Sequence, residues 1–274
     1  MTPDRDELDA LDREYARFNA KKAIGDTRES SFREESIGPL VVTQDPSRTS
    51  SYYQRVLGVT PASLSYLDRA LDLFQRPVPE LRIDVDKSDS PALADELEAR
   101  GFVACEELIW LRADVGVAPA DDSSPLVRRL GPTEQDSILP FLTLGGPVDP
   151  AIWALRRNHH CTETFRAFVI DEEGKAVAMA TTFVGEHGLL LGNALTLPTH
   201  RRRGYQRALL RARLADAAEL GARWVVTDVE PDTTSFRNCG REGFTETRRQ
   251  VVWERSEDAS PTTVHTDDSE RSRP

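Results

Sequence analysis

The 274-residue chain has only three cysteines, Cys105, Cys161 and Cys239, and they stand far apart. This spacing excludes a disulfide framework and the paired-cysteine pattern of a zinc site. Long apolar runs are also absent, since none approaches the roughly 20 residues that a membrane helix requires. The first residues are acidic, where a secretory signal would be basic and then apolar. We therefore expect a cytoplasmic protein with no bound metal and no membrane association.

Basic residues are in deficit as well. The chain has 35 lysines and arginines against 46 aspartates and glutamates, which gives a formal net charge of -11. This acidity argues against nucleic acid as a general partner. A hydrophobic content of 39% and a charged content of 30% are typical of a globular protein. The length is sufficient for two domains of ordinary size.

One stretch of the chain inverts this charge. Residues 187–215 contain six arginines and no acidic side chain. Within the stretch a strand-like run, Leu189–Leu197, ends at a proline, the turn Arg201-Arg202-Arg203-Gly204 follows, and a helical pattern begins at Tyr205. A tight cationic turn between a strand and a helix leaves backbone N–H groups unpaired at the positive end of a helix dipole, and that geometry binds phosphate. The alternative is a solvated arginine face on an ordinary helix.

Apolar periodicity predicts strands and helices on both sides of this turn. Asp171–Lys175 has the composition of a hairpin turn, and Gly221 is the expected C-terminal cap of the helix that starts at Tyr205. The expected helices are 4–22, Pro61–Phe74, Pro91–Arg100, segments within Thr133–His159, Tyr205–Leu220 and Thr234–Arg241. The expected strands are Ile37–Val42, Leu81–Val85, 108–111, Leu126–Leu130, Phe165–Ile170, Ala176–Val184, Leu189–Leu197, Trp224–Val229 and one near Val251–Trp253.

The two halves of the chain end alike. In each half a strand, a helix, a Gly-Phe pair and a further strand follow one another, with the pairs at Gly101-Phe102 and Gly243-Phe244. The identity is weak but the order is constant, so we interpret the halves as two copies of one unit. We predict an N-terminal domain at 1–120, a C-terminal domain at 125–255, a linker at Ala118–Pro125 and a disordered tail at 256–274.

Two motifs in the second half resemble the GNAT superfamily of acyl-CoA-dependent N-acyltransferases. The family signature Arg/Gln-x-x-Gly-x-Gly/Ala corresponds to the six residues from Arg201 to Gln206. The segment Ser235–Phe244 is similar to the Ser-x-Arg-Asn-x-x-Arg-x-Gly-Phe form of the helix after the family's fifth strand. The likeness covers about 125–254, and the N-terminal half is similar only in its last third. Gln206 departs from the signature, which prefers Gly or Ala there.

The resemblance implies a mixed α/β GNAT fold: a mostly antiparallel central sheet with a splayed parallel strand pair and flanking helices, in tandem with a degenerate N-terminal copy. It also implies acetyl-CoA, or another acyl-CoA, as co-substrate. Backbone N–H groups of Arg202–Arg207 would hold the pyrophosphate, and a strand N–H near Leu195 would polarise the thioester carbonyl. The residues expected to bind the co-substrate are Ala194, Leu195, Thr196, Arg201, Arg202, Arg203, Gly204, Tyr205, Gln206, Arg207, Ser235 and Asn238.

The implied reaction is direct attack of a primary amine on the thioester in a ternary complex, and it requires a proton acceptor. Glu230, at the end of the fifth strand of the family fold, is the first candidate, followed by Asp228 and Glu186. Many family members protonate the leaving thiolate with a tyrosine before the Gly-Phe pair, and Cys239 holds that position here. The Cys239 thiol is therefore a candidate donor, and packing of the helix is its alternative role.

Several alternatives stay open at this level. Adjacent histidines diverge in strands and helices, so His159-His160-Cys161 is not expected to bind a metal. Trp153 and Phe141 lie in the region that lines the acceptor pocket in the family, or they belong to the core. We interpret the chain as an N-acetyltransferase for an unidentified amine, active as a monomer or homodimer. The alternative is a non-catalytic acyl-CoA binder with a regulatory or scaffold role.

Overall fold

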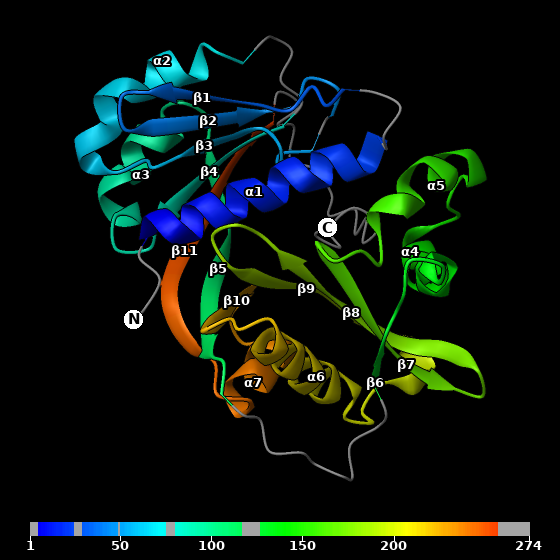
Figure 1. The fold of residues 1–274 in the computed structure, drawn as a ribbon. Coiled ribbons are helices and arrows are strands. Elements are labelled where there is room, and N and C mark those ends of the chain that lie inside the picture. The colour runs from blue at the N-terminus through cyan, green and yellow to red at the C-terminus, as the bar shows by residue number, and fades with distance from the viewer. Residues whose placement is uncertain (1–4, 25–28, 49, 75–79, 117–126, 257–274) are drawn as a thin grey trace. The chain divides into compact units, whose positions relative to one another are not determined.

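The computed structural model describes residues 5–24, 29–48, 50–74, 80–116 and 127–256 (Figure 1). They form two compact units that are interleaved along the chain. Within the described ranges, unit 1 comprises residues 5–24 and 110–246, and unit 2 comprises residues 29–109 and 247–256. The sequence predicted two contiguous domains, 1–120 and 125–255, as two copies of one fold. That interpretation stays a prediction. The linker, and all of the predicted tail except Ser256, lie outside the described residues.

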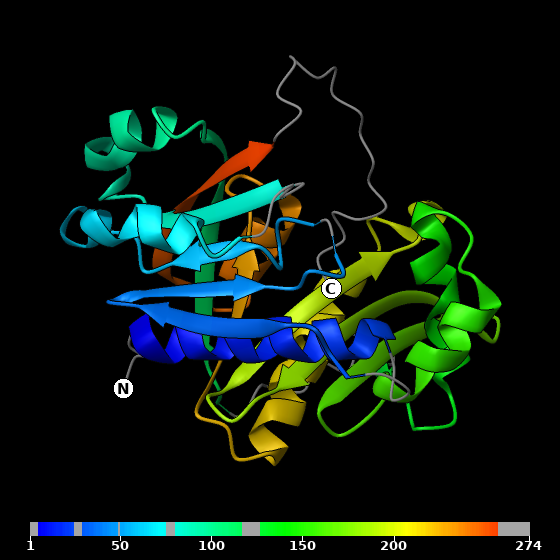
Figure 2. The ribbon, with the colours of Figure 1, turned by 90° about the horizontal axis from the view of Figure 1, so that it is seen from above.

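Unit 2 is a sheet covered by short helices (Figure 2). Its elements are β1 (Arg33–Ile37), β2 (Leu40–Gln44), β3 (Arg55–Leu57), the 3-10 helix η1 (Pro61–Tyr66), α2 (Leu67–Leu71), β4 (Glu80–Asp86), α3 (Ser90–Glu98) and the larger parts of β5 (Val103–Asp114) and β11 (Thr245–Ser256). The strand order is β1-β2-β3-β4-β11-β5. β3 and β4 are parallel, whereas β1–β2, β2–β3 and β4–β11 are antiparallel.

The core of unit 2 follows from strand alternation. Ile83 and Val85 point to one face of β4, where they pack with Leu67 of α2 and Leu97 of α3. The opposite face of β4 carries Asp84, which is 1% exposed. Oxygen atoms of Asp84 lie 2.7 Å from Arg55 Nη2 and 2.6 Å from Arg82 Nε. Burial alone would raise the pKa of Asp84, but the two guanidinium groups hold it far below its ordinary value.

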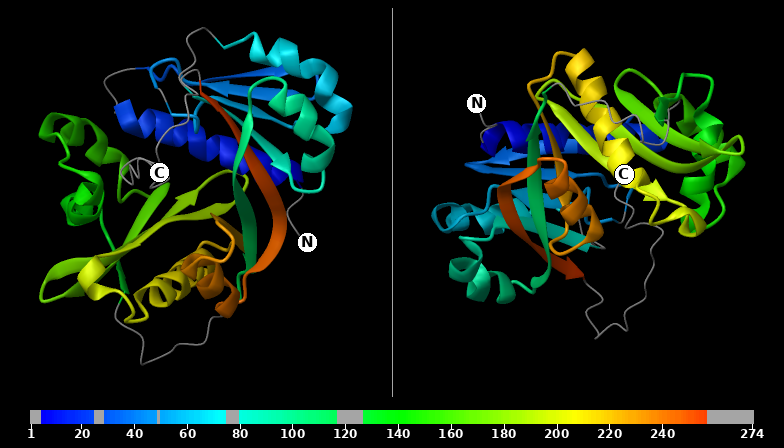
Figure 3. Two further views of the ribbon diagram at one scale, coloured as in Figure 1. Left: turned by 180° about the vertical axis from the view of Figure 1, so that it is seen from behind. Right: turned by 90° about the horizontal axis from the view of Figure 1, so that it is seen from below.

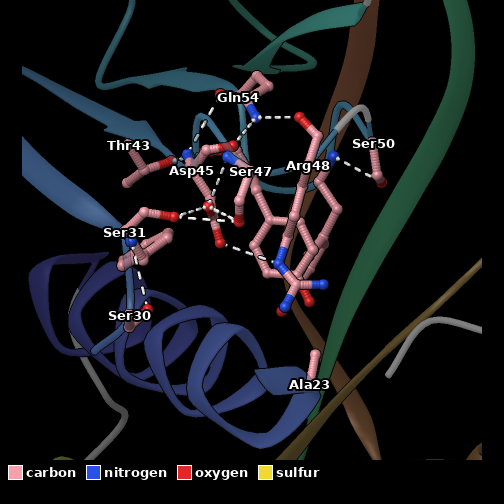
Figure 4. A network of polar contacts seen from close by, with 12 residues as sticks. Ala23, Ser30, Ser31, Thr43, Asp45, Ser47, Arg48, Ser50 and Gln54 are labelled. Atoms are coloured by element: carbon pink, nitrogen blue, oxygen red, sulfur yellow. Dashed lines mark hydrogen bonds and ion pairs between the residues drawn. The ribbon is translucent and has the colours of Figure 1, made fainter. Parts of the chain in front are cut away.

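A second polar network fixes the connection between β2 and β3 (Figure 4). The Asp45 carboxylate accepts the Ser47 N–H at 3.0 Å and Arg48 Nε at 2.9 Å, while its backbone carbonyl accepts Gln54 Nε2 at 2.8 Å. Asp45 is 1% exposed, and its pKa is lowered because hydrogen bonds from Ser31, Ser47 and Arg48 to the carboxylate outweigh the effect of burial. The carboxylate therefore stabilises the loop through hydrogen bonds to its own residues.

Unit 1 is also built on strands, with helices on both of their faces. Its elements are α1 (Arg5–Ile24), the end of β5, β6 (Val127–Arg129), η2 (Gln135–Ile138), α4 (Leu139–Leu142), η3 (Thr143–Gly145), α5 (Pro150–Arg156), η4 (Arg157–His159), β7 (Phe165–Glu172), β8 (Lys175–Val184), β9 (Leu189–Thr196), η5 (Pro198–His200), α6 (Tyr205–Glu219), β10 (Trp224–Val229), α7 (Thr234–Arg241) and the start of β11. The strand order is β5-β10-β9-β8-β7-β6.

The two faces of β8 pack against different helices, because its side chains alternate. Ala178 and Ala180 pack with Leu209 of α6. Phe183 on the other face packs with Leu11 and Tyr15 of α1. Figures 1 and 3 show α1 and α6 on opposite sides of β8 and β9. The helix predicted at 4–22 therefore forms in the N-terminal part of the chain but is a component of unit 1.

The predicted strand–helix–strand repeat is visible in β4-α3-β5 and β10-α7-β11. The last strand of each copy pairs with the first strand of the other copy. β11 lies beside β4, with Trp253 opposite Ile83, and β5 lies beside β10. In unit 1 the N–H of Val115, just after β5, donates to the carbonyl of Arg223 at 2.9 Å. This exchange explains why the compact units do not follow contiguous halves of the chain.

Several expected elements formed and others were wrong in detail. The helix from Tyr205 ends as predicted, since Gly221 has φ 72° and the Ala222 N–H reaches the Ala217 carbonyl at 3.0 Å. The single strand predicted at Ile37–Val42 is wrong, because Gly38, with φ 60°, turns the chain into the β1–β2 hairpin. Strand β3 was missed because its run is very short. No helix in the described part of the chain combines the length and apolarity needed to cross a membrane.

The buried Asp84 cluster gives a stability prediction. Asp84→Asn removes the carboxylate that two buried guanidinium groups share, and we expect it to lower the free energy of unfolding by about 3–5 kcal/mol. Asp68→Asn is the control, because Asp68 pairs with Arg100 in the same unit but its side chain is 71% exposed. That change should cost about 0–1 kcal/mol. Urea denaturation at neutral pH measures both, and equal losses would contradict the cluster's role.

The same cluster gives a pH dependence. The pKa of Asp84 is lower in the folded protein than in the unfolded chain. Its stabilisation is therefore complete above the unfolded pKa of about 3.9 and is lost as the pH falls toward the folded value. The stability difference between the wild type and Asp84→Asn should accordingly be constant from neutral pH to about pH 5 and shrink below about pH 4.

Candidate functional site

Strands β9 and β10 separate along their length. Among the described residues, their parallel pairing is limited to Leu190 and Val226. One residue further, Thr227 Oγ1 donates to the Leu191 carbonyl at 2.8 Å. Beyond this point Ala194 is exposed, although β9 is an interior strand of the sheet. The open edge of β9 therefore begins at Gly192 and includes the predicted residues Ala194, Leu195 and Thr196.

A bulge in β9 lies where the separation starts. Met179 of β8 pairs with Leu195, but Thr181 pairs with Gly192, so β9 carries an extra residue between them. Asn193 in this bulge has φ 48°, a left-handed conformation that asparagine tolerates better than most residues. Its Nδ2 donates to Thr181 Oγ1 at 3.0 Å and to Tyr15 Oη at 3.2 Å.

Sequence reasoning missed Asn193 and Tyr15 as parts of this site. The Gly192-Asn193 pair within a strand pattern was an available signal, since both residues favour bulges and turns. Tyr15 gave no such signal, because an aromatic residue on the apolar face of an amphipathic helix is expected for packing alone. Only the packing of α1 against β9 brings its hydroxyl to the bulge.

The turn before α6 presents unpaired backbone donors. Arg202 and Gly204 have φ 66° and 81°, and residues 201–204 are exposed. Among the described residues, the backbone N–H groups of Arg202 through Arg207 have no hydrogen-bond acceptor. A Cβ added to Gly204 would have no atom within 4 Å. The turn thus combines a left-handed backbone, open space and the positive end of a 15-residue helix.

The arginine side chains of the turn are less available than their number indicates. Arg203 Nη1 lies 2.9 Å from Glu172. Arg207 and Arg211 both contact Glu242, at 2.6 and 2.8 Å. Arg202 has no carboxylate partner among the described residues. The positive charge seen in the sequence is therefore partly neutralised by acidic residues from distant positions, and the backbone N–H groups are the donors that stay unpaired among the described residues.

Gln206 connects the turn to α7. Its Nε2 donates to Ser235 Oγ at 3.2 Å, and its Oε1 accepts Asn238 Nδ2. The side chain of Gln206 is thereby directed toward α7, and its backbone N–H stays available at the helix start. The structure brings together three residues that the two motifs predicted separately.

The candidate catalytic residues are distributed along the strand pair. Glu230 follows β10 directly and is exposed, with no hydrogen-bond partner for its carboxylate among the described residues. Glu186 precedes β9 and therefore lies at the opposite end of the parallel pair, so these two candidates are not brought together. Asp228 lies within β10 and is half-buried. Cys239 on α7 is 2% exposed, and burial raises the pKa of its thiol to about 11.

The remaining candidates belong to the core of unit 1. Phe141 and Trp153 are buried in one hydrophobic cluster with Cys161. The His160 ring packs against Trp153 and Phe165, and burial lowers its pKa well below the usual value. The structure assigns Phe141 and Trp153 to packing. Within the described ranges, no group of three or more His, Cys, Asp or Glu side chains is arranged to hold a metal ion.

Comparison with known proteins identifies the same region. Residues 140–242 match the model of the acetyltransferase (GNAT) family. No curated protein is similar enough in sequence to count as a match. Among solved structures, a GCN5-related N-acetyltransferase from Kribbella flavida is 18% identical, with a TM-score of 0.63 over 94% of this chain and 96% of that one.

Two further structures share the fold. A GCN5-related N-acetyltransferase from Sphaerobacter thermophilus is 15% identical, with a TM-score of 0.56 over 81% of this chain and 82% of that one. A tandem GNAT protein from the clavulanic acid biosynthesis pathway is 16% identical, with a TM-score of 0.56 over 93% of this chain and 97% of that one. At these identities the likeness shows the fold alone, and it covers both halves of the chain. Residues 140–242 therefore form a domain of the GNAT acetyltransferase family.

Proposed function

We propose that this protein is an N-acetyltransferase that transfers an acetyl group from acetyl-CoA to a primary amine. The observation that carries the proposal is the group of unpaired N–H donors from Arg202 to Arg207 beside the open edge of β9. Backbone N–H groups at a helix start bind a diphosphate without help from side chains. The open space in front of Gly204 leaves room for such a group to approach.

The strand edge supplies the second part of the proposed site. Ala194, Leu195 and Thr196 lie where β10 no longer pairs with β9, so their backbone groups can accept an added extended chain such as a pantetheine arm. A β9 N–H near Leu195 would stabilise negative charge on a carbonyl oxygen held there. Ser235 and Asn238, together with Gln206, would line the same side through α7.

Acetyl-CoA would supply the activated acetyl group, and the chain supplies proton transfer. Glu230 is the proposed base, because its exposed carboxylate stands at the end of β10 without a partner among the described residues. A base at this position would accept the proton that the primary amine must lose when it attacks the thioester. Cys239 is the proposed donor, since a thiol with a pKa of about 11 is protonated at neutral pH.

A second function is favoured by one observation. Cys239, at the position of the family's tyrosine, is buried to 2% exposure. A chain without an effective proton donor at this position would bind an acyl-CoA without turning it over, as a regulatory or scaffold protein does. Release of free CoA with a panel of amines separates the two functions.

The equivalent turn in unit 2 is capped by its own side chains. In each unit a parallel crossover joins two strands through a helix, β3-η1-α2-β4 in unit 2 and β9-α6-β10 in unit 1. At the start of η1, Thr60 and Ser63 cap one another's N–H groups through a capping box, and Pro61 has no N–H. We therefore assign a single acyl-CoA site to each chain.

Glycine 204 provides the first test. Gly204→Glu should abolish acetyl-CoA binding, because the new carboxylate would occupy the anion site. Gly221→Glu is a matched control at the other end of α6, with φ 72° and nothing within 4 Å of an added Cβ. Both variants should lose a similar stability of about 1–3 kcal/mol from the left-handed backbone. Isothermal titration calorimetry measures binding, and unchanged affinity in Gly204→Glu would contradict the placement of the site.

The number of sites is a separate prediction. Calorimetry should give one acetyl-CoA bound per chain, because the Thr60–Ser63 capping box closes the equivalent turn of unit 2. Two equivalent sites, or none, would be inconsistent with the assignment.

The proposed base is tested by Glu230→Gln. The variant should bind acetyl-CoA as the wild type does, while kcat for CoA release with an accepted amine falls by about 10²–10⁴-fold. Glu186→Gln, at the opposite end of the strand pair, should leave kcat unchanged. Equal rates for the wild type and Glu230→Gln would remove Glu230 from the mechanism.

A further inference from the structure

Arg213 is a buried cation inside unit 1. It lies on α6, is 2% exposed, and points its guanidinium at the sheet. Nη1 donates to the Thr181 carbonyl at 3.0 Å and to the Gly192 carbonyl at 3.3 Å, and Nε donates to the Leu209 carbonyl at 3.2 Å. Burial lowers the pKa of Arg213 to about 10, so the side chain is charged at neutral pH.

No carboxylate balances this charge among the described residues. Arg166, a second buried arginine of unit 1, is held differently. Arg166 Nη1 lies 2.7 Å from Asp216, and its Nη2 lies 2.5 Å from Glu163. A buried charge held only by carbonyl oxygens is costly, and it creates a positive potential in its surroundings. Such a group is rarely kept for packing alone.

The hydrogen bonds of Arg213 to Thr181 and Gly192 place its positive charge where β9 and β10 separate. Thr181 and Gly192 are the register pair beside the β9 bulge, where the open strand edge begins. On the α7 side, the guanidinium acts electrostatically on the Cys239 thiol and opposes the rise of its pKa by burial. Arg213 therefore lies where the strand edge proposed for the thioester begins, on a helix that also contacts α7.

We propose that Arg213 is a positioning and electrostatic residue that stabilises the departing CoA thiolate. The inference rests on the proposed function and deepens it. In the step concerned, the amine nitrogen bonds to the thioester carbon, the C–S bond breaks, and its electron pair stays on sulfur. The amine proton goes to the base, and the sulfur leaves as an anion, which is protonated afterwards. A fixed positive charge below the bulge lowers the energy of that anion without giving up a proton.

A purely structural role for Arg213 is the competing explanation. The bulge leaves the Thr181 and Gly192 carbonyls needing donors, and Arg213 provides them. A neutral donor could do the same, whereas only a charge stabilises a thiolate. Arg213→Gln keeps amide donors without the charge, and Arg213→Lys keeps the charge with a different hydrogen-bond geometry. Comparing these two variants separates the roles.

The first measurement is the ionisation of bound CoA, which does not require turnover. Ultraviolet absorbance of the thiolate is recorded against pH for free CoA bound to each protein, with desulfo-CoA as the reference that lacks the thiol. We expect the thiol bound to the wild type to ionise at least about one pH unit below free CoA. This shift should persist in Arg213→Lys and disappear in Arg213→Gln.

The other titratable groups around Arg213 do not imitate this signal. Cys239 of α7 has a pKa of about 11, and its absorbance is removed by the desulfo-CoA reference. Asp216, on the same helix, is paired with Arg166, and Glu242, at the end of α7, is paired with Arg207 and Arg211. β8 and β9 contribute only backbone carbonyls to Arg213.

The second measurement is turnover. Arg213→Gln should lower kcat at least about tenfold with little change in KM for acetyl-CoA, and Arg213→Lys should recover most of the loss. Arg166→Met is the control for removal of a buried arginine from unit 1, and it should lower thermal stability without shifting the ionisation of bound CoA.

The outcomes are distinct. Arg213→Gln with the wild-type ionisation of CoA and the wild-type kcat overturns the proposal and leaves Arg213 a structural cap of the bulge. If Arg213→Gln does not fold, the wild type decides, because bound CoA that ionises like free CoA overturns the proposal too. Failure of desulfo-CoA to bind the wild type refutes the proposed function itself, and the role of Arg213 with it.

Discussion

The site depends on the left-handed backbone at Gly204, which places the start of α6 beside the end of β9 with its first N–H groups unpaired. A residue with a side chain strains this conformation, and a capping side chain would use the donors. The equivalent place in unit 2 shows a different solution, because Thr60 and Ser63 cap one another's N–H groups there and Pro61 has none. The same crossover thus carries the proposed anion site in one unit and a capped helix start in the other.

The β9 bulge is held from both faces of the sheet. Asn193, supported by Tyr15 of α1, lies on one face, and the Arg213 guanidinium lies on the other. A bulge fixed in this way sets where β9 leaves β10 and which backbone groups face the opening. Residues far apart in sequence therefore determine one local backbone conformation. Rigid support of this kind is what a site that stabilises developing charge requires.

Local signals predicted the parts of the site that depend on the chain near them. The turn from Arg201 to Gly204, the helix after it and the motif at Ser235–Asn238 all formed, because strand ends, glycines and helix periodicity act over a few residues. Partners from distant segments were not predictable. Glu172 and Glu242 neutralise Arg203 and Arg207, and the separation of Glu186 from Glu230 follows from strand direction alone. The β1–β2 hairpin was missed because the apolar residues on both sides of Gly38-Pro39 were interpreted as one continuous strand.

By itself, the sequence determined the order of elements, the glycine turn before α6 and the family of residues 140–242, since each is encoded in contiguous residues. Tertiary structure alone decided that the last strand of each repeat pairs with the other repeat, that α1 reaches the β9 bulge, and that the buried Arg213 donates to backbone carbonyls. These outcomes depend on pairing and burial between segments separated by dozens of residues or more. Periodicity records which face of an element is apolar, but it does not record which element will cover that face.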